Sequence, residues 1–310
     1  MTAALTVGFV GIGRMGWPMA RNVAAAGFPT WVYDADPARA ERFAAECGGH
    51  AAASLEAVGS AADLVVTMLP TGKDVRAVVL GGAETGRGLA ATLREGAVIV
   101  DMSSSDPLGT RELGAELRAR GIALIDAPVS GLVAKAETGT LTIMIGADDE
   151  AALASAEPVL RVLGERLVRT GALGCGHAMK ALNNVVAATA FTVTAEALIV
   201  GKRFGLDPAV MVDVMNTSTG RNFHTDMSFP GHVLTRKFAT GFALGLLAKD
   251  VAIAADLGAA LGATAPVMEL VKRLAAEGRD EVGADEDNTA IVRRWERLNE
   301  VILSSKEQDA

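Results

Sequence analysis

Cysteine is scarce in this chain of 310 residues, which contains only Cys47 and Cys175. Two isolated cysteines form neither a C-x-x-C metal pattern nor the disulfide framework of a small secreted protein. Such sparse use of cysteine is typical of a reducing compartment. We therefore predict a cytoplasmic protein that binds no metal.

Positive charge is also in short supply, with 29 Lys and Arg against 37 Asp and Glu and a net charge of -8. Nucleic-acid-binding proteins normally present a basic face, so this balance argues against a nucleic-acid partner. It still allows one positive pocket for an anionic ligand. The first residues have no basic region, and we expect no signal peptide. The most apolar later stretch, Val185–Val200, is interrupted by threonines and Glu196, which predicts a buried helix and no membrane span.

Strand-like and helix-like stretches alternate over the first part of the chain. Up to about residue 170, short apolar β-branched runs are separated by helical stretches rich in Ala, Arg and Glu. This alternation predicts an α/β fold with a parallel, doubly wound sheet of the Rossmann type, covered by helices on both faces. The predicted strands are Thr6–Val10, Thr30–Tyr33, Leu64–Met68, Ala97–Asp101, Ile122–Asp126, Leu141–Ile145 and Leu167–Arg169, and the helices between them include Met15–Ala26, Pro37–Glu46 and Pro107–Arg120.

Long helical patterns replace the strands after Gly176. Asp207 and Pro208 have the residue types of an N-cap and a first helical position. We therefore predict a nucleotide-binding domain over residues 1–170 and an all-helical domain over residues 171–310, joined by the first long helix. The predicted helices of the second domain are His177–Gly205, one starting at Pro208, Ala248–Leu261, Pro266–Glu277 and Thr289–Ser304.

A G-x-G-x-x-G motif lies directly between the first predicted strand and the first predicted helix. Its first glycine permits a tight turn, its second lets the backbone approach a pyrophosphate, and its third lets helix and strand pack closely. The helix N-terminus adds N–H donors for the phosphates. Alone the motif is a weak indicator, but its position favours a dinucleotide site formed by Gly11, Ile12, Gly13, Arg14, Met15 and Gly16.

Asp34 ends the second predicted strand, eighteen residues beyond Gly16. A carboxylate at this place accepts hydrogen bonds from the adenosine ribose and repels a 2′-phosphate. The alternative role, capping the helix that starts at Pro37, suits Asp36 better. We therefore predict NAD as the cofactor, with NADP left open because Arg39 offers a nearby cation.

Four further segments resemble the β-hydroxyacid dehydrogenase family, which includes 3-hydroxyisobutyrate dehydrogenase. The resemblance runs from residue 7 to about residue 260, with the motifs in the family's order and spacing. Agreement of several separate motifs is far more specific than the glycine motif alone. The segments are GFVGIGRMGWPMARN from Gly8, DAPVSG from Asp126 with GTLTIMIG from Gly139, GCGHAMKALNN from Gly174, and the Lys249-Asp250 pair.

The resemblance implies that Lys180 is the catalytic proton-transfer residue and that Asn184 binds the substrate hydroxyl beside it. Four residues apart on a predicted helix, the two share a face. A general base of this kind contributes about 10²–10⁴-fold to the rate. A solvated helix lysine is the ordinary alternative, and it would come first without the family match. His177, three residues earlier, is interpreted as a local helix residue.

The resemblance also implies where the substrate carboxylate and the rest of the cofactor bind. Ser130 and the backbone N–H groups of Gly131 and Leu132 form the predicted substrate-binding segment. The family usually has glycine where this chain has Leu132, whose Cβ disfavours a positive φ and occupies space beside the acid. We expect substrate selectivity to depend on Leu132 and on the Arg221–His224 stretch. Further predicted cofactor contacts are Leu69, Pro70, Ser104 and Lys249.

Other classes fit the sequence less well. A methyltransferase would not need Asp34 and Lys180 beside the complete glycine motif. An imine reductase shares the fold but generally lacks the catalytic lysine, and 6-phosphogluconate dehydrogenases have a much larger helical domain. A non-catalytic nucleotide sensor would have no use for Lys180, Asn184 and Ser130. The resemblance and the apolar long helix together predict a homodimer or homotetramer.

Overall fold

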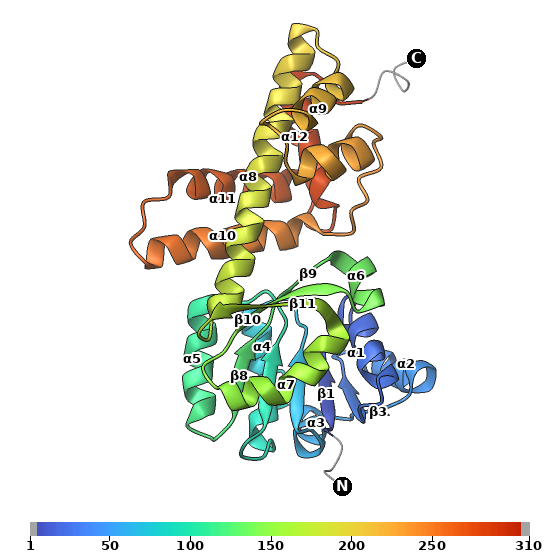
Figure 1. Ribbon diagram of the computed structural model, residues 1–310, viewed down its shortest axis with the longest axis vertical. Coiled ribbons are helices and arrows are strands. Elements are labelled where there is room, and N and C mark those ends of the chain that lie inside the picture. The colour runs from blue at the N-terminus through green and yellow to red at the C-terminus, as the bar shows by residue number, and fades with distance from the viewer. Residues whose placement is uncertain (1–4, 305–310) are drawn as a thin grey trace. The chain divides into compact units, whose positions relative to one another are not determined.

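The computed structural model describes residues 5–304 of the chain, and these divide into two compact units (Figure 1). The first unit extends to Lys180 and the second begins at Ala181. The sequence predicted a boundary near residue 170. The division by contacts falls later, inside the helix α8 (Cys175–Phe204), which both units share.

The first unit is an α/β domain, as the sequence predicted. All seven predicted strands are present, within three residues of the predicted bounds. Its elements are β1 (Val7–Val10), α1 (Gly16–Ala25), β2 (Thr30–Tyr33), α2 (Pro37–Cys47), β3 (His50–Ala51), α3 (Leu55–Ala61), β4 (Leu64–Thr67), α4 (Gly72–Leu80), β5 (Gly81–Gly82), β6 (Gly86–Arg87), η1 (Leu89–Ala91), β7 (Val98–Asp101), α5 (Pro107–Arg118), β8 (Ala123–Asp126), β9 (Val129–Ser130), α6 (Leu132–Thr138), β10 (Leu141–Gly146), α7 (Glu150–Leu163) and β11 (Gly164–Gly171).

The sheet has the order β11-β10-β8-β7-β4-β1-β2-β3, and it is not parallel throughout. The six strands β8, β7, β4, β1, β2 and β3 are parallel to one another, whereas β10 runs antiparallel to β8 and to the short β9. The prediction of a purely parallel sheet was therefore wrong at this edge. The physical reason is that a buried strand has the same apolar pattern in either direction, so direction depends on the connection through β9 and α6.

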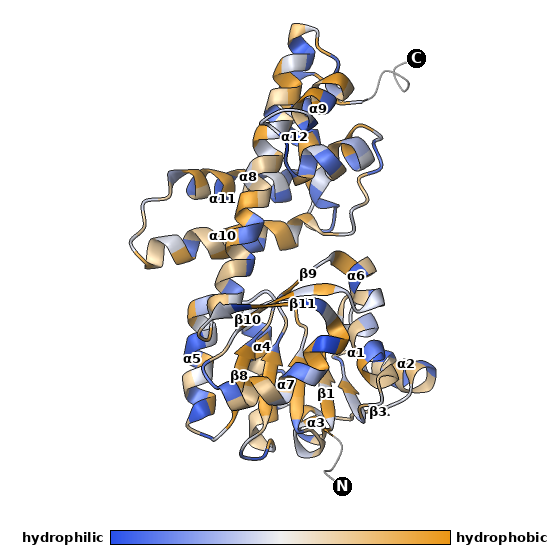
Figure 2. Cartoon of the chain, in the orientation of Figure 1, coloured by the Kyte–Doolittle hydropathy of each residue, from blue (hydrophilic) through white to orange (hydrophobic). Residues whose placement is uncertain are grey.

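Helices cover both faces of the sheet because its central strands are buried on both sides. In β7, Val98 and Val100 pack into one hydrophobic cluster with α1, α2 and α7, while Ile99 packs into a second cluster with α3, α4 and α5. The two-residue period of a strand produces this division. Figure 2 shows the result, hydrophobic strands under helices that carry hydrophilic residues.

The second unit is helical. It contains most of α8, followed by α9 (Pro208–Asn216), a π-helix η2 (His224–Val233), α10 (Leu244–Ala260), α11 (Pro266–Val282), η3 (Asn288–Ile291) and α12 (Val292–Asn299). Small residues such as Ala181, Ala188 and Ala254 let α8, α10 and α11 pack closely. As predicted, Asp207 caps α9 and Pro208 is its first residue.

The second unit differs from the predictions in several places. Helix α10 begins at Leu244, four residues before the predicted Ala248, and α11 ends at Val282, five residues after the predicted Glu277. The predicted helix Thr289–Ser304 is a 3₁₀ turn followed by α12, which ends at Asn299 because Glu300 has a left-handed φ of 53°. The π-helix η2 was not predicted, since its wider turns leave no 3.6-residue pattern.

By length and composition alone, α8 could cross a membrane, and half of its most apolar window is buried in the structure. The core helix of a soluble protein passes the same test.

Candidate active site

The glycine loop after β1 has the geometry that a dinucleotide requires. Gly11 has a φ of 88°, and a Cβ there would lie 2.4 Å from the carbonyl oxygen of Met68. A Cβ on Gly16 would lie 1.9 Å from the carbonyl oxygen of Gly11. Around Gly13, by contrast, no protein atom lies within 4 Å of an added Cβ. The first and third glycines are thus required by the fold itself, while the second leaves open space for a ligand.

The N-terminus of α1 differs from the other long helices of this unit. Side chains cap α2, α4, α5 and α7, namely Asp36, Thr71, Asp106 and Asp149. Met15, at the N-cap of α1, makes no such hydrogen bond. The first N–H groups of a helix need partners, and a phosphate is well suited to supply them. Together with the space beside Gly13, this fits the pyrophosphate of a dinucleotide.

Asp34 lies at the end of β2 and holds the glycine loop. Its Oδ2 accepts the backbone N–H of Ile12 at 2.9 Å, and its Oδ1 accepts the N–H of Asp36 and the Arg39 guanidinium, both at 3.0 Å. The side chain is only 8% exposed. The capping of α2 falls to Asp36, as the sequence suggested. A carboxylate has about four acceptor positions, so one is left for a ribose hydroxyl.

The loops with Leu69, Pro70 and Ser104 follow β4 and β7, at the same edge of the sheet. The buried Asp101 ties them together. Its carboxylate accepts hydrogen bonds from the Thr67 hydroxyl, at 2.9 Å, and from the backbone N–H of Ser103. The hydroxyl of Ser103 in turn accepts a hydrogen bond from the backbone N–H of Leu69 at 2.9 Å. The sequence did not single out Asp101, which sets the shape of the predicted cofactor-lining loops.

The predicted substrate-binding segment links β9 to α6. Ser130 ends β9, Gly131 has a φ of 144°, and Leu132 begins α6 with a φ of 59°. The departure from the family's glycine therefore falls on a position with left-handed backbone, which costs a non-glycine residue about 1–2 kcal/mol. Leu132 is 44% exposed. The segment is anchored to α1, because Asn22 donates to the carbonyl of Ala136 at 2.9 Å.

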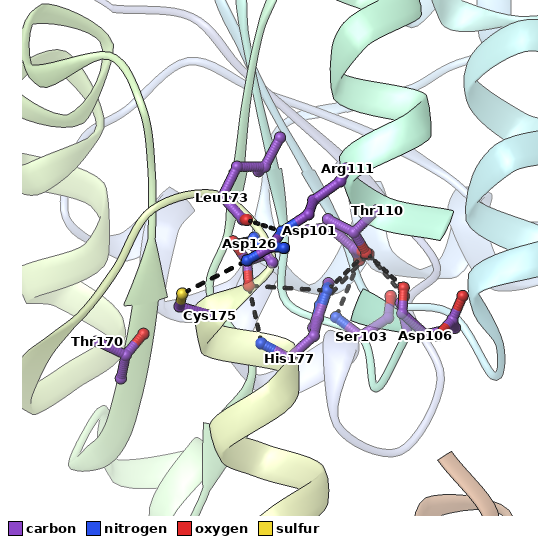
Figure 3. A network of polar contacts seen from close by, with 12 residues as sticks. Asp101, Ser103, Asp106, Thr110, Arg111, Asp126, Thr170, Leu173, Cys175 and His177 are labelled. Carbon is purple, nitrogen blue, oxygen red and sulfur yellow. Dashed lines mark hydrogen bonds and ion pairs between the residues drawn. The ribbon is translucent and has the colours of Figure 1, made fainter. Parts of the chain in front are cut away.

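Asp126, the first residue of DAPVSG, caps the helix that bears Lys180 (Figure 3). Its Oδ1 accepts the N–H of Gly174 at 2.8 Å, and its Oδ2 accepts the N–H of His177 at 2.7 Å. The carboxylate is completely buried. A negative charge is favourable at a helix N-terminus, and here it comes from a strand end distant in the sequence.

Two motif glycines make room for this carboxylate, and a third has a backbone conformation that favours glycine. A Cβ on Gly146 would lie 2.3 Å from Asp126 Oδ1, and one on Gly176 would lie 2.8 Å from Asp126 Oδ2. Gly174 has a φ of 89°. Gly146 of GTLTIMIG and Gly176 of GCGHAMK therefore serve the packing of Asp126, and a Cβ on Gly176 would also lie 2.4 Å from the carbonyl oxygen of Met144. Burial raises the pKa of Asp126, and the charge of His177 and the N–H groups oppose that rise.

Lys180 and Asn184 lie one turn apart on α8. Lys180 is partly buried and Asn184 is 8% exposed. The amide of Asn184 donates to Asp250 Oδ2 at 2.6 Å and accepts a hydrogen bond from Asn183 at 3.3 Å. Asp250, on α10, is 2% exposed, and its other oxygen lies 3.3 Å from Lys249 Nζ. Asp250 thereby fixes the orientation of Asn184, a role the sequence alone did not assign.

The Arg221–His224 stretch precedes and enters η2. Arg221 forms an ion pair with Asp226, Phe223 is 65% exposed, and His224 is buried with its Nδ1 2.9 Å from Ser228 Oγ. Only Phe223 and Arg221 present their side chains at the surface. Among residues 5–304, no group of three or more His, Cys, Asp or Glu is arranged to hold a metal ion.

Comparison with known proteins assigns both parts of the chain. Residues 6–173 match the NAD-binding domain of 6-phosphogluconate dehydrogenase, and residues 174–295 match the NAD-binding domain of NADP-dependent 3-hydroxyisobutyrate dehydrogenase.

Three curated relatives cover between 83% and 98% of the chain. The 2-(hydroxymethyl)glutarate dehydrogenase of Eubacterium barkeri is 33% identical over 98% of this chain and 99% of its own. The mitochondrial 3-hydroxyisobutyrate dehydrogenase of Bos taurus is 35% identical over 83% and 76%, respectively. The NAD-dependent L-serine dehydrogenase of Pseudomonas aeruginosa is 34% identical over 86% and 90%.

Solved structures of proteins similar to this chain support the same family. Mycobacterium tuberculosis 3-hydroxyisobutyrate dehydrogenase, described with L-serine, has a TM-score of 0.84 at 33% identity, covering 94% of this chain and 99% of its own. An imine reductase from Myxococcus stipitatus has a TM-score of 0.60 at 21% identity, over 94% and 99%, and shares the fold alone.

The glycine loop, Asp34 and the helical second unit define a nucleotide-dependent dehydrogenase. The chain belongs to the β-hydroxyacid dehydrogenase family and is similar to 3-hydroxyisobutyrate dehydrogenase over 83% of its length in sequence and 94% in structure. It is an NAD(P)-dependent oxidoreductase of β-hydroxyacids.

Proposed function

We propose that this enzyme transfers a hydride between NAD(H) and a small β-hydroxyacid whose alcohol is primary, with Lys180 as the proton-transfer residue. The observation that carries the proposal is the pair formed by Lys180 and Asn184, one turn apart on α8, with Asn184 held by the buried Asp250. A bound NAD(P) supplies the hydride acceptor for oxidation and the donor for reduction.

The roles of Lys180 and Asn184 follow from what an alcohol needs as it is oxidised. Its hydroxyl proton must leave as the carbinol carbon becomes a carbonyl. A partly buried lysine amine can accept this proton and return it in reduction. The Asn184 amide has one further N–H, because the other is donated to Asp250. It is suited to donate to the substrate oxygen and keep it beside the lysine.

The substrate carboxylate needs binding groups other than Lys180 and Asn184. Ser130 offers a hydroxyl, and the backbone N–H groups of Gly131 and Leu132 offer two further donors. We assign the substrate carboxylate to this segment. The anchoring of α6 through Asn22 keeps the segment in place relative to the glycine loop, since both are attached to α1.

The class of substrate follows from the chemistry of the relatives' substrates. 3-Hydroxyisobutyrate, L-serine and 2-(hydroxymethyl)glutarate are named for three relatives and share the core HOCH₂–CH(R)–COO⁻. They differ only in R, which is a methyl, an ammonium or a carboxyethyl group. We propose this core as the substrate of this enzyme. Leu132, where the family usually has glycine, narrows the space beside the acid and favours a small R.

Asp34 supports NAD as the preferred cofactor. Its buried negative charge repels a 2′-phosphate, and its free acceptor position suits the ribose 2′-hydroxyl of NAD. The guanidinium of Arg39 lies 3.0 Å from the carboxylate of Asp34 and 3.8 Å from that of Asp36. Its charge is therefore already balanced by two carboxylates.

The direct test is to measure reduction of NAD and NADP across a panel of HOCH₂–CH(R)–COO⁻ acids, with wild type beside Lys180→Ala. We expect turnover with NAD that falls by about 10²–10⁴-fold in Lys180→Ala while NADH binding survives. A Lys237→Ala variant, which alters an exposed lysine outside the assigned site, is the control and should behave as wild type. Turnover that is unaffected in Lys180→Ala would refute the assigned role.

We further propose a homodimer or homotetramer in which α8 packs against a second copy. Val186, Val193 and Val200 are 67%, 58% and 68% exposed and recur every seven residues on α8. A helix stripe with this spacing is typical of a helix–helix contact. Light scattering should show that Val193→Glu reduces the molar mass, whereas Ser218→Glu, which adds the same charge outside the stripe, does not. An unchanged mass in Val193→Glu would exclude this surface.

A cytoplasmic location remains our proposal. Cys47 and Cys175 are both free thiols, as expected in a reducing compartment. Fractionation of the source cells, with antibody detection of the chain, tests it. Recovery of the chain in a membrane or secreted fraction would contradict it.

A further inference from the structure

We propose that His177 is a positioning residue for Lys180, because its imidazole locks the first turn of α8 onto the edge of the sheet. The inference rests on the proton-transfer role proposed for Lys180. His177 is not required by that role itself, and the family resemblance assigned it none.

The imidazole is completely buried, yet it is surrounded by polar groups (Figure 3). Its Nδ1 lies 2.9 Å from the hydroxyl of Thr110 on α5. Its Nε2 lies 3.6 Å from Asp101 Oδ2 at the end of β7 and makes no hydrogen bond with the described residues. Its backbone N–H donates to Asp126 at the end of β8. One residue thus joins α8 to three other elements of the first unit.

The hydrogen bond to Thr110 has a defined direction. The Thr110 hydroxyl has one proton and lies 2.9 Å from the carbonyl oxygen of Asp106, which can only accept. Because that proton is donated to the carbonyl oxygen of Asp106, the Thr110 oxygen accepts a hydrogen bond from His177 Nδ1–H. Thr110 is itself 5% exposed, on the second turn of α5. The ring is therefore held by a buried partner whose own position is fixed by a helix.

The position of Lys180 depends on how this turn is placed. Lys180 is three residues beyond His177 on α8, about 4.5 Å further along the helix axis. Gly174 and Gly176, before it, have no side chains that could hold the turn. Asp126 holds the N-terminal end of α8 in place. The contact of His177 with Thr110 then fixes how the first turn of α8 is rotated about that end. A displacement of a catalytic group by about 1 Å can cost on the order of 10²-fold in rate.

The test compares kcat, substrate KM and the Kd of NADH across single variants. His177→Leu should lower kcat by about 10- to 100-fold while the Kd of NADH stays within about twofold of wild type. His177→Gln, which keeps a side-chain N–H, should recover part of kcat. Thr110→Val should also lower kcat, because it removes the partner of Nδ1. Val159→Ala, a buried truncation on α7, controls for lost stability and should keep kcat.

A double-mutant cycle with Lys180→Ala separates this inference from the proposed function. If His177 acts through Lys180, the double variant has the same residual kcat as Lys180→Ala alone. An equal fold loss in both backgrounds, or a wild-type kcat in His177→Leu and Thr110→Val at matched stability, would overturn the positioning role. A fully active Lys180→Ala would overturn the proposed function as well. If His177→Leu does not fold, His177→Gln and Thr110→Val supply the same comparison.

Discussion

The side-chain amide of Asn184 donates to the buried carboxylate of Asp250 across 2.6 Å, joining α8 to α10. Because Asn184 is assigned to the substrate oxygen, we predict that Asp250→Ala lowers kcat by at least about tenfold, as the freed amide turns away. Asp256→Ala, which alters an exposed carboxylate on the same helix, should keep wild-type kcat. Steady-state kinetics with both variants tests this prediction. Equal kcat values for Asp250→Ala and Asp256→Ala would show that Asp250 has no role in the site.

The glycine loop offers a matched pair of substitutions. Gly16→Ala places a methyl group 1.9 Å from the Gly11 carbonyl oxygen and should destabilise the apo-enzyme. Gly13→Ala meets no protein atom within 4 Å and should leave apo stability unchanged. Its Cβ would nevertheless occupy the space assigned to the pyrophosphate, so we expect NADH binding to weaken by roughly tenfold or more. Thermal unfolding and NADH titration of both variants test this, and undiminished NADH binding by Gly13→Ala would count against the assignment.

Cofactor preference should respond to the charge of Asp34. Asp34→Asn keeps an acceptor for the Ile12 N–H but removes the negative charge, which leaves Arg39 with Asp36 as its one remaining carboxylate of the two. We expect the ratio of kcat/KM with NADP to that with NAD to rise by about tenfold or more. Arg39→Ala, measured beside it, should not raise the ratio. A ratio unmoved by Asp34→Asn would indicate that another residue sets the preference.

Leu132 has a left-handed backbone at the start of α6, with a φ of 59°. Leu132→Gly removes strain of about 1–2 kcal/mol, partly offset by the greater entropy of glycine in the unfolded chain, so stability should rise by up to about 1 kcal/mol. The same change opens space beside the acid and should lower KM for acids with a larger R. Leu132→Ala retains a Cβ and should not gain stability. Urea unfolding and a KM series report the two effects independently.

Acid should destabilise the second unit through His224. Burial lowers the pKa of His224 below its ordinary value of 6.5, and the carbonyl of Ala187 opposes the shift. The unfolded chain therefore binds the proton first as pH falls, so the stability present above pH 6.5 is lost progressively below it. We expect the unfolding midpoint of His224→Gln to vary less than that of wild type between pH 7 and about 5. His50→Gln, at an exposed histidine, should follow wild type.

Local pattern was sufficient for much of the fold. The strand at Thr30–Tyr33, the Asp36 cap of α2 and the start of α9 at Pro208 all follow from residues near one another in sequence, and all are confirmed. The antiparallel direction of β10 has no such local cause, because apolar alternation is the same in both directions. The end of α12 depends on one left-handed residue, Glu300, whose type gives no indication of it.

The residues of the candidate site also fall into those that local sequence motifs identify and those that only the fold brings together. Motif spacing was enough to identify the glycine loop, Lys180 and Asn184 as candidates. It did not reveal that Asp250 holds Asn184 or that Asp126 caps α8, since these partners lie 66 and 51 residues apart. One indication of the buried Asp126 carboxylate was present in the sequence, namely several glycines around the catalytic segment that have no turn residues beside them. A buried carboxylate lies against Gly146 and Gly176, and the backbone carbonyl oxygens of Ala172 and Met144 also leave no room for a Cβ there.

The Asp126 cap determines where the chain can be cut and rejoined. A chimera made at residue 170, or at the seam between residues 173 and 174 where the two family matches meet, would take Asp126 from one parent and Gly174, Gly176 and His177 from the other. A parent with a larger residue at the position of Gly176 would press a side chain against the buried carboxylate. A junction after Lys180 keeps the carboxylate, its glycines and the catalytic lysine from a single parent. Exchange of helical halves between relatives, as a route to new substrates, should therefore be better tolerated at the later junction than at the earlier ones.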